Sequence, residues 1–172
     1  VTYTPTTDFS GTDTFTFKTT DGTANSSTKT VTITVFNRHL SIATQIGADI
    51  DGEAVGDQSG GSVSFNEDAT IMAIGATYND GSIGLDQGHV RVYQYSSDSW
   101  TQLGSDIDGE AGNDLSGQSV SLSSDGTTVA IGATSNDTMF ADQGHVRIYS
   151  YNGTSWTQLG GDIDGEAARD FS

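Results

Sequence analysis

Residues 62–77 read SVSFNEDATIMAIGAT and residues 88–102 read GHVRVYQYSSDSWTQ, and these two stretches decide the fold class. Apolar residues recur at every second position, and turn-forming residues interrupt the pattern, as in short β-strands. Residues 71–74 are apolar on both faces, which indicates a sheet that is covered on both sides. The pattern predicts four strands, at residues 62–65, 70–76, 89–95 and 99–103.

The same pattern returns further along the chain, which identifies a tandem repeat. The phrase DIDGEA starts at Asp49, Asp106 and Asp162, at offsets of 57 and 56 residues. Units 46–102 and 103–158 are identical at more than half of their aligned positions, and a partial unit covers 159–172. We therefore expect an all-β chain with two four-stranded antiparallel sheets, packed face to face like the blades of a β-propeller, and the start of a third. The strands predicted in the second unit are 119–122, 127–134, 145–151 and 155–159.

Both ends of the repeat region look interrupted. The third copy stops 14 residues into its unit, which indicates a fragment of a longer array. Residues 44–47 match residues 101–104, so we expect them to form the outer strand of an incomplete preceding sheet. Trp100 and Trp156 recur in the fourth strand of each unit, where we expect them to fill the gap between neighbouring sheets.

The first 36 residues differ from the repeats. Apolar residues alternate with threonine in TFTF at 14–17 and in VTITV at 31–35. This predicts a β-hairpin with one apolar side, and because a lone hairpin is marginal in water we assign it to a larger sandwich. The chain is accordingly divided into an Ig-like part at 1–36, a linker at 37–43 and repeats at 44–172.

The charge balance restricts the partners. Lys and Arg number 6 against 23 Asp and Glu, and the formal net charge is -17. Such a chain is repelled by nucleic-acid backbones and by anionic membrane surfaces, so neither is an expected partner. No cysteine is present, and no apolar run is long enough to insert into a membrane. Cations are the expected partners.

Local motifs carry two family resemblances. Y-x-P at 3–5, F-x-G-x-D-x-F-x-F at 9–17 and V-x-I-x-V at 31–35 are similar to the C-terminal half of a cadherin-like or bacterial Ig-like tandem domain. The repeats resemble FG-GAP propellers, as in the integrin alpha chain. The motifs are D-x-S-G-x-S-V-S, A-I-G-A and G-H-V-R-x-Y, at 57–64, 73–76 and 88–93 and again at 114–121, 130–133 and 144–149. Both resemblances imply a large secreted or cell-surface protein, whose partner would be an extracellular protein or glycan ligand.

Calcium is not carried over from the FG-GAP resemblance. In that family calcium lies in an acidic loop between the first two strands of a blade. Here the corresponding loop is only residues 66–68 or 124–126, so a calcium site is not expected there.

A separate calcium hypothesis rests on the loop between repeats. Acids stand at places 1, 3, 5 and 9 of each copy, and alternate carboxylates in a turning loop suit calcium coordination. Against calcium, Gly52 stands at place 4 rather than place 6, and no acid stands at place 12. The alternative is a solvated acidic turn in which Asp57 and its equivalents accept hydrogen bonds from amides of the following Ser-Gly turn. The candidate ligands are Asp49, Asp51, Glu53, Asp57, Asp106, Asp108, Glu110, Asp114, Asp162, Asp164, Glu166 and Asp170.

The histidines invite a catalytic or zinc interpretation. His89 and His145 occupy equivalent positions beside Arg91 and Arg147, so each belongs to its own sheet and the two do not meet at one metal. We expect both to have a structural hydrogen-bonding role. No nucleophile elbow, phosphate loop or zinc spacing is found in the sequence, and an enzyme is not expected.

These features favour a non-enzymatic adhesion or ligand-display module of a large, repeat-containing surface protein, stabilised by calcium if the loop hypothesis holds. The alternative is an accessory propeller module of a secreted polysaccharide-acting enzyme whose catalytic residues lie outside the repeats.

Overall fold

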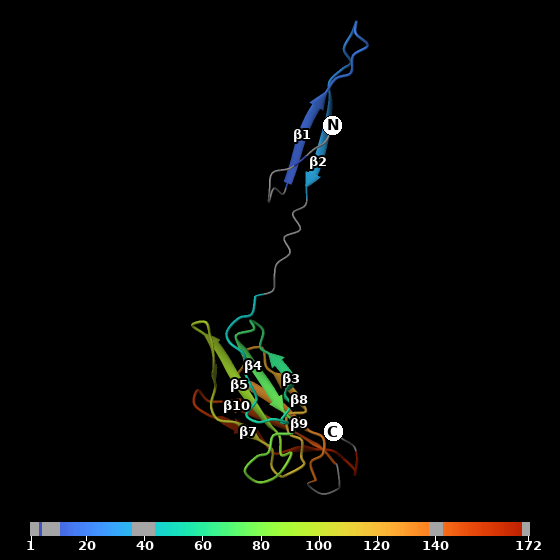
Figure 1. Cartoon of the computed structure of the whole chain (residues 1–172). Coiled ribbons are helices and arrows are strands. Elements are labelled where there is room, and N and C mark those ends of the chain that lie inside the picture. Colours follow the sequence, from blue (N-terminus) through green and yellow to red (C-terminus); the bar gives the residue numbers. More distant parts are fainter. Residues whose placement is uncertain (1–3, 5–10, 36–43, 138–142, 170–172) are drawn as a thin grey trace. The chain divides into compact units, whose positions relative to one another are not determined.

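The computed structural model describes residue 4 and residues 11–35, 44–137 and 143–169. Every regular element in these ranges is a β-strand, and the strands form three antiparallel sheets (Figure 1). The contacts divide the chain into two compact units, Val1–Thr44 and Gln45–Ser172, which are described separately. No helix long and apolar enough to cross a membrane occurs in the described ranges.

The first unit holds one hairpin, as the alternation at 14–17 and 31–35 predicts. Strands β1 (Gly11–Phe17) and β2 (Lys29–Val35) pair antiparallel, with Phe15 opposite Val31. Phe15 and Phe17 stay partly exposed, while Val31 is half-buried. In the connecting loop the Asp21 carboxylate accepts hydrogen bonds from the amides of Thr23 and Ala24, both at 2.8 Å, which fixes the turn.

The first repeat forms its own sheet, and the four predicted strands are all present. Their order in the sheet is the order in the chain, as in an antiparallel meander. β3 starts three residues before the prediction, at Ser59, because the register shifts between Ser59 and Ser62. A further strand, β7 (Ile107–Asp108), pairs with β5 next to β6. The four predicted strands are β3 (Ser59–Phe65), β4 (Ile71–Ala76), β5 (His89–Ser96) and β6 (Ser99–Gln102).

The second repeat builds the same sheet again, and it is separate from the first, as predicted. Each sheet therefore has five strands rather than four, because a two-residue strand that no periodicity can reveal is added to the edge. The strands are β8 (Ser119–Leu122), β9 (Thr128–Ala133), β10 (His145–Tyr151), β11 (Trp156–Gln158) and β12 (Ile163–Asp164), which pairs with β10.

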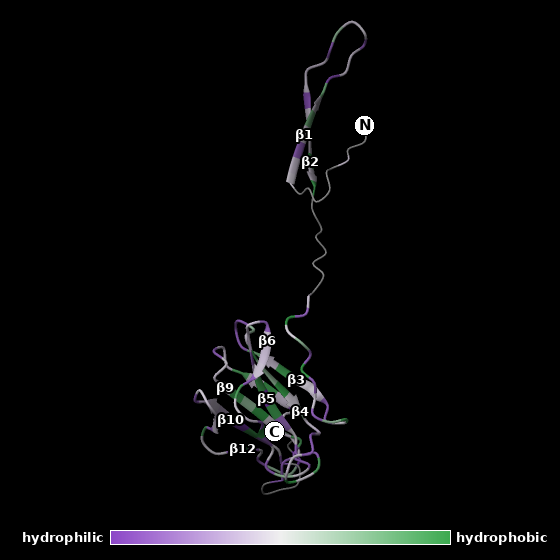
Figure 2. Cartoon of the chain, turned by 60° about the vertical axis from the view of Figure 1, so that its left-hand side comes forward, coloured by the Kyte–Doolittle hydropathy of each residue, from purple (hydrophilic) through white to green (hydrophobic). Residues whose placement is uncertain are grey.

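The two sheets pack against each other through a shared core. The Ser62 hydroxyl of β3 donates to the Gly117 carbonyl at 2.6 Å, and the Ser64 hydroxyl accepts from the Leu122 amide of β8 at 2.9 Å. Figure 2 shows hydrophobic residues concentrated on the strands of this unit. The buried cluster contains residues of both sheets: Ala73, Val90, Val92, Ile107, Val129 and Ile131.

The packing joins unlike faces of two similar sheets. In the second sheet, His145 and Arg147 lie opposite Ala133 and Ile131, and Ile131 is in the core between the sheets. In the first sheet, the equivalent His89 and Arg91 lie opposite Ala76 and Ile74, on the face that points away from Ala73 and the core. The face that carries the histidine and the arginine therefore points outward in the first sheet. In the second sheet, the equivalent face packs against the first sheet. We call this arrangement the head-to-tail joint.

Each repeat also binds the segment before it through tryptophan. Trp156 Nε1 donates to the Leu103 carbonyl at 2.8 Å, so this ring connects the two sheets as predicted. Trp100 Nε1 donates in the same way to the Ile46 carbonyl at 3.1 Å. Gly47 and Gly104, at φ +74° and +73°, let the backbone approach these rings, since a Cβ there would lie 2.7 and 3.1 Å from the indole.

The predicted outer strand at residues 44–47 is wrong. These residues contain no strand, although Ile46 occupies the place of Leu103 in the tryptophan contact. The equivalent residues 101–102 belong to β6 because β5 runs beside them, whereas no strand is paired with 44–47. Two packed sheets form no closed ring, which needs at least four.

Candidate functional site

The four carboxylates of one inter-repeat loop do not converge, although Glu53 and Asp57 both accept a hydrogen bond from Asn79 Nδ2, at 3.4 and 3.0 Å. The Asp49 carboxylate accepts from Gln45 Nε2 at 2.7 Å, and that of Asp57 accepts from the Ala54 amide at 3.1 Å. Asp51 is exposed. Glu53 forms an ion pair with Arg91. Among the residues that the structure describes, no three acids of one loop place their oxygens within 4.8 Å of one another.

The later copies repeat these partners. Asp106 and Asp162 accept from Gln102 and Gln158, each at 2.6 Å. Asp114 accepts from the Ala111 amide at 2.9 Å and from Asn136 Nδ2 at 3.0 Å. Asp108 and Asp164 lie opposite the two histidines in the sheet register, Glu166 is exposed, and Asp170 lies outside the described residues.

Asp57 and Asp114 hold their loops in a way the sequence did not indicate. The solvated-turn alternative to calcium had them accept hydrogen bonds from the following Ser-Gly turn. Instead each accepts from the amide three residues earlier, in Ala54 or Ala111, and from an asparagine of the β4–β5 or β9–β10 loop. The loop curls back on itself because Gly56 and Gln58 adopt positive φ, at 107° and 53°. Both carboxylates are buried structural acceptors.

Carboxylates from successive loops meet instead at the histidine of each sheet. Within the described ranges, two groups of three possible metal ligands lie within 4.8 Å: Glu53, His89 and Asp106, and Glu110, His145 and Asp162. In each group, the glutamate is the fifth residue of the acidic loop before the sheet. The aspartate is the first residue of the acidic loop after the same sheet. The histidine comes from the first residue of the third strand.

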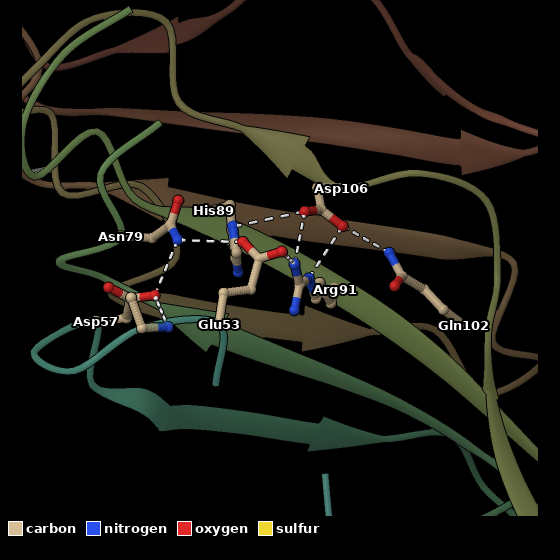
Figure 3. A network of polar contacts seen from close by, with 8 residues as sticks. Glu53, Asp57, Asn79, His89, Arg91, Gln102 and Asp106 are labelled. Carbon is tan, nitrogen blue, oxygen red and sulfur yellow. Dashed lines mark hydrogen bonds and ion pairs between the residues drawn. The ribbon is translucent and has the colours of Figure 1, made fainter. Parts of the chain in front are cut away.

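In the first sheet an arginine occupies the centre of the cluster (Figure 3). Arg91 Nε and Nη2 donate to the two oxygens of Asp106, both at 3.0 Å, in a bidentate pair. Arg91 also forms an ion pair with Glu53. His89 Nδ1 lies 3.8 Å from Asp106 Oδ2, beyond hydrogen-bond range. We call Glu53, His89, Arg91 and Asp106 the outer cluster, because they lie on the outward face of the first sheet.

The electrostatics of the outer cluster follow from this pairing. Burial acts to raise the pKa of Asp106, but hydrogen bonds from Arg91 and Gln102 outweigh it and hold that pKa below its usual value. Burial lowers the pKa of His89, and the Arg91 charge adds to the effect. Burial also raises the pKa of Asp108, and the neighbouring Asp106 carboxylate adds to it. Arg91 thus neutralises carboxylates that would otherwise attract a cation.

In the second sheet the same residue types are arranged differently. Arg147 Nη2 donates to the Asp108 carbonyl of the first sheet at 2.8 Å, and Nη1 lies 3.5 Å from Glu110 Oε1. His145 Nδ1 lies 4.0 Å from a carboxylate oxygen of Glu110 and 4.0 Å from one of Asp162. We call Glu110, His145, Arg147 and Asp162 the inner cluster, because the head-to-tail joint covers it.

The expected hydrogen-bonding role of the histidines is not seen. Neither ring nitrogen of His145 has a hydrogen-bond partner among the described residues. The Nδ1 atom of His89 lies too far from the Asp106 carboxylate for a hydrogen bond. The prediction that the two histidines serve separate sites is confirmed. Sequence reasoning missed the two clusters because it grouped acids by loop. The available signal was that each H-x-R strand has one acidic loop before it and another after it.

A comparison with known families identifies the first unit. A family model described as a bacterial Ig domain matches residues 1–34. This part of the chain is Ig-like. The match includes the Ig-like hairpin β1–β2, and it agrees with the bacterial Ig-like resemblance of motifs at 9–17 and 31–35. No curated protein matches the chain. The cadherin-like and FG-GAP resemblances stay predictions.

Proposed function

We propose that this chain is a non-enzymatic, extracellular adhesion or ligand-display module of a large surface protein. The observation that carries the proposal is the bacterial Ig match at residues 1–34, followed in the same chain by a tandem repeat of like sheets. Bacterial Ig-like domains are common in extracellular and surface proteins. The repeated sheets are the part of this chain to which we assign ligand binding.

Charge supports a protein or glycan ligand over a nucleic acid. The chain has only 6 Lys and Arg, and two of these, Arg91 and Arg147, contact the carboxylates of the clusters. Few cations therefore remain for phosphate groups, while the net charge of -17 repels them.

The chemistry of the clusters supports a role without catalysis. The histidines, the natural acid–base groups at neutral pH, are buried, and Arg91 is fixed between two carboxylates. A general base needs access to the proton that it removes, and these rings are almost fully covered. A stabilising calcium ion is part of the proposal. The net charge of -17 supports it, whereas the carboxylates of one loop, which do not converge, give it no support.

The test is a binding assay on the whole chain. We expect beads coated with the folded chain to show saturable binding on an array of glycans and extracellular proteins, and beads with the heat-denatured chain to show none. Incubating the chain with soluble polysaccharides and measuring new reducing ends tests the enzymatic alternative directly. Cleavage by the purified chain would contradict the proposal. So would the absence of any saturable ligand together with a hydrolase or lyase domain in the same gene.

A further inference from the structure

We propose that Glu110, His145 and Asp162 of the inner cluster bind one divalent transition-metal ion, such as Zn²⁺, inside the head-to-tail joint. The site differs from the calcium hypothesis in its ligands, which include an imidazole and combine two acidic loops. It also differs in location, since it lies between the sheets rather than in one loop.

The ligands come from both sides of the joint. Glu110 directly follows Gly109 after β7, which belongs to the first sheet. His145 begins β10 and Asp162 precedes β12, both of the second sheet. The possible ligand atoms of all three residues lie within 4.8 Å of one another. An ion bound here would connect the two sheets directly.

His145 supplies the second observation, independent of the acids. Its side chain is only 1% exposed, and neither ring nitrogen has a hydrogen-bond partner in the part of the chain that the structure describes. A buried polar group left without a partner has given up its hydrogen bonds to water for nothing in return, so such groups are rare and call for an explanation. The Nδ1 atom is directed at two carboxylates, at 4.0 Å from each.

These separations suit a metal ion better than hydrogen bonds. A hydrogen bond from nitrogen to oxygen spans about 2.7–3.2 Å, so 4.0 Å is too long. Two ligands that each lie about 2.0–2.2 Å from one ion are separated by up to about 4 Å. Imidazole nitrogen and carboxylate oxygen are both ligand types that zinc binds, whereas calcium takes six to eight oxygens. Glu110 is partly exposed, so water can complete the coordination.

The neighbouring arginine leaves the site available. Arg147 is held by the Asp108 carbonyl, and its guanidinium carbon lies 5.6 Å from the centre of the Tyr149 ring. Its nearest carboxylate oxygen belongs to Glu110 at 3.5 Å, while Asp162 is bonded to Gln158. Carboxylate oxygens of Glu110 and Asp162 each lie 4.0 Å from His145 Nδ1.

The outer cluster is a built-in control. It has the same residue types, but Arg91 binds both Glu53 and Asp106 and so occupies the position between them. A metal ion there would have to displace a bidentate ion pair. We therefore expect the inner cluster to bind the ion and the outer cluster not to.

The experiment is a titration of the whole chain with ZnCl₂ by calorimetry, with Co²⁺ absorption as a second readout. We expect one Zn²⁺ per chain, a higher melting temperature with zinc, and a visible Co²⁺ band of a four-coordinate site. His145→Gln should weaken binding at least about tenfold, whereas the matched control His89→Gln should leave it unchanged. Asp162→Asn changes a less buried ligand and keeps its shape, so it tests the site even if His145→Gln fails to fold.

Three results would overturn the proposal. One is the absence of zinc binding by the folded, unmodified chain at millimolar zinc. Another is zinc binding that survives both His145→Gln and Asp162→Asn. The third is an equal loss of binding in His89→Gln, which would show that zinc associates with acidic histidine clusters without selecting the inner one.

Discussion

The first acid of every inter-repeat loop is held by a glutamine four residues earlier. Gln45 binds Asp49, Gln102 binds Asp106 and Gln158 binds Asp162. Each of these carboxylates therefore already has a hydrogen-bond donor close by in the sequence, without any bound ion. Asp106 differs because it also accepts a hydrogen bond from Arg91, which makes it half of an ion pair.

The Arg91–Asp106 pair predicts a pH-dependent stability. Because hydrogen bonds from Arg91 hold the pKa of Asp106 low despite burial, the pair stabilises the fold above the unfolded-state pKa of about 3.9. This contribution is lost as pH falls through the lower, folded-state pKa. Arg91→Lys keeps the charge but loses the bidentate geometry, so its melting temperature should fall below that of the unmodified chain at pH 7.

Thermal melts between pH 7 and pH 3 check this expectation, and the difference between the two chains should shrink below about pH 4. His89 and Asp108 lie beside the pair in both chains, so their charges are common to the two melts. A difference that stays constant down to pH 3 would show that Arg91 acts through packing rather than through Asp106.

The two tryptophans provide a matched pair for one hydrogen bond. Trp156→Phe removes the bond to the Leu103 carbonyl, which joins the sheets, and should reduce the free energy of unfolding by about 1 kcal/mol beyond the loss of ring area. Trp100→Phe removes the bond to the Ile46 carbonyl at an exposed site and should cost less. Urea unfolding of both variants measures the two losses. Equal losses would contradict the assignment of Trp156 to the joint.

Among the secondary-structure elements, close approach of β4 to the second sheet depends on a missing side chain. A Cβ on Gly75 would collide with the backbone carbonyl of Gly117, which has little freedom to move. The equivalent Gly132 would meet only the side chain of Ser119. The equivalent strands β4 and β9 thus differ in whether they can accommodate a side chain at this glycine, because only β4 packs against a following sheet.

This difference predicts unequal effects of the same substitution. Gly75→Ala should destabilise the fold by about 1–3 kcal/mol through overpacking, and Gly132→Ala should cost less, because a hydroxyl can rotate away. Chemical denaturation of the two variants is the measurement. A greater loss in Gly132→Ala would show that the second sheet, not the joint, is the tighter contact.

The strands were predictable from the sequence because period-two alternation records burial directly. All eight longer repeat strands lie at the expected places, and β8 and β10 match to the residue. β7 and β12 were missed because a strand of two residues is too short to show an alternating pattern. Residues 44–47 were wrongly assigned to a strand because they resemble β6 in sequence but have no paired strand beside them. The two clusters could not be predicted because they depend on which faces of the sheets meet.

For the molecule as a whole, the net charge of -17 makes cations the expected modulators of stability. The calcium hypothesis predicts that millimolar calcium raises the melting temperature more than sodium at equal ionic strength. Sodium only screens repulsion, while an ion bound to the folded state adds about 2.7 kcal/mol at a hundredfold excess over Kd. Asp51→Asn combined with Asp108→Asn should remove most of the difference. Equal responses to sodium and calcium would leave the solvated-turn interpretation.

Exposed apolar side chains on the outward face of the first sheet lead us to expect self-association. Ile46, Val63 and Phe65 are each about half exposed, and Phe65 and Ile46 line a pocket together with Trp100. Light scattering should show concentration-dependent oligomers, and Phe65→Ser should reduce them. The equivalent Leu122→Ser should destabilise the fold instead, because Leu122 packs against the shared core. A compact monomer with a cooperative melt at every concentration would contradict the expectation.

The head-to-tail joint also bears on how such a gene changes over generations. Every unit brings both complementary surfaces with it, so gain or loss of one whole unit by unequal recombination leaves each surviving contact complete. A deletion that begins and ends within different units at unequal positions would damage two neighbours at once. A change of copy number by whole units should therefore preserve the contacts between sheets, provided that the phase of the repeat is kept.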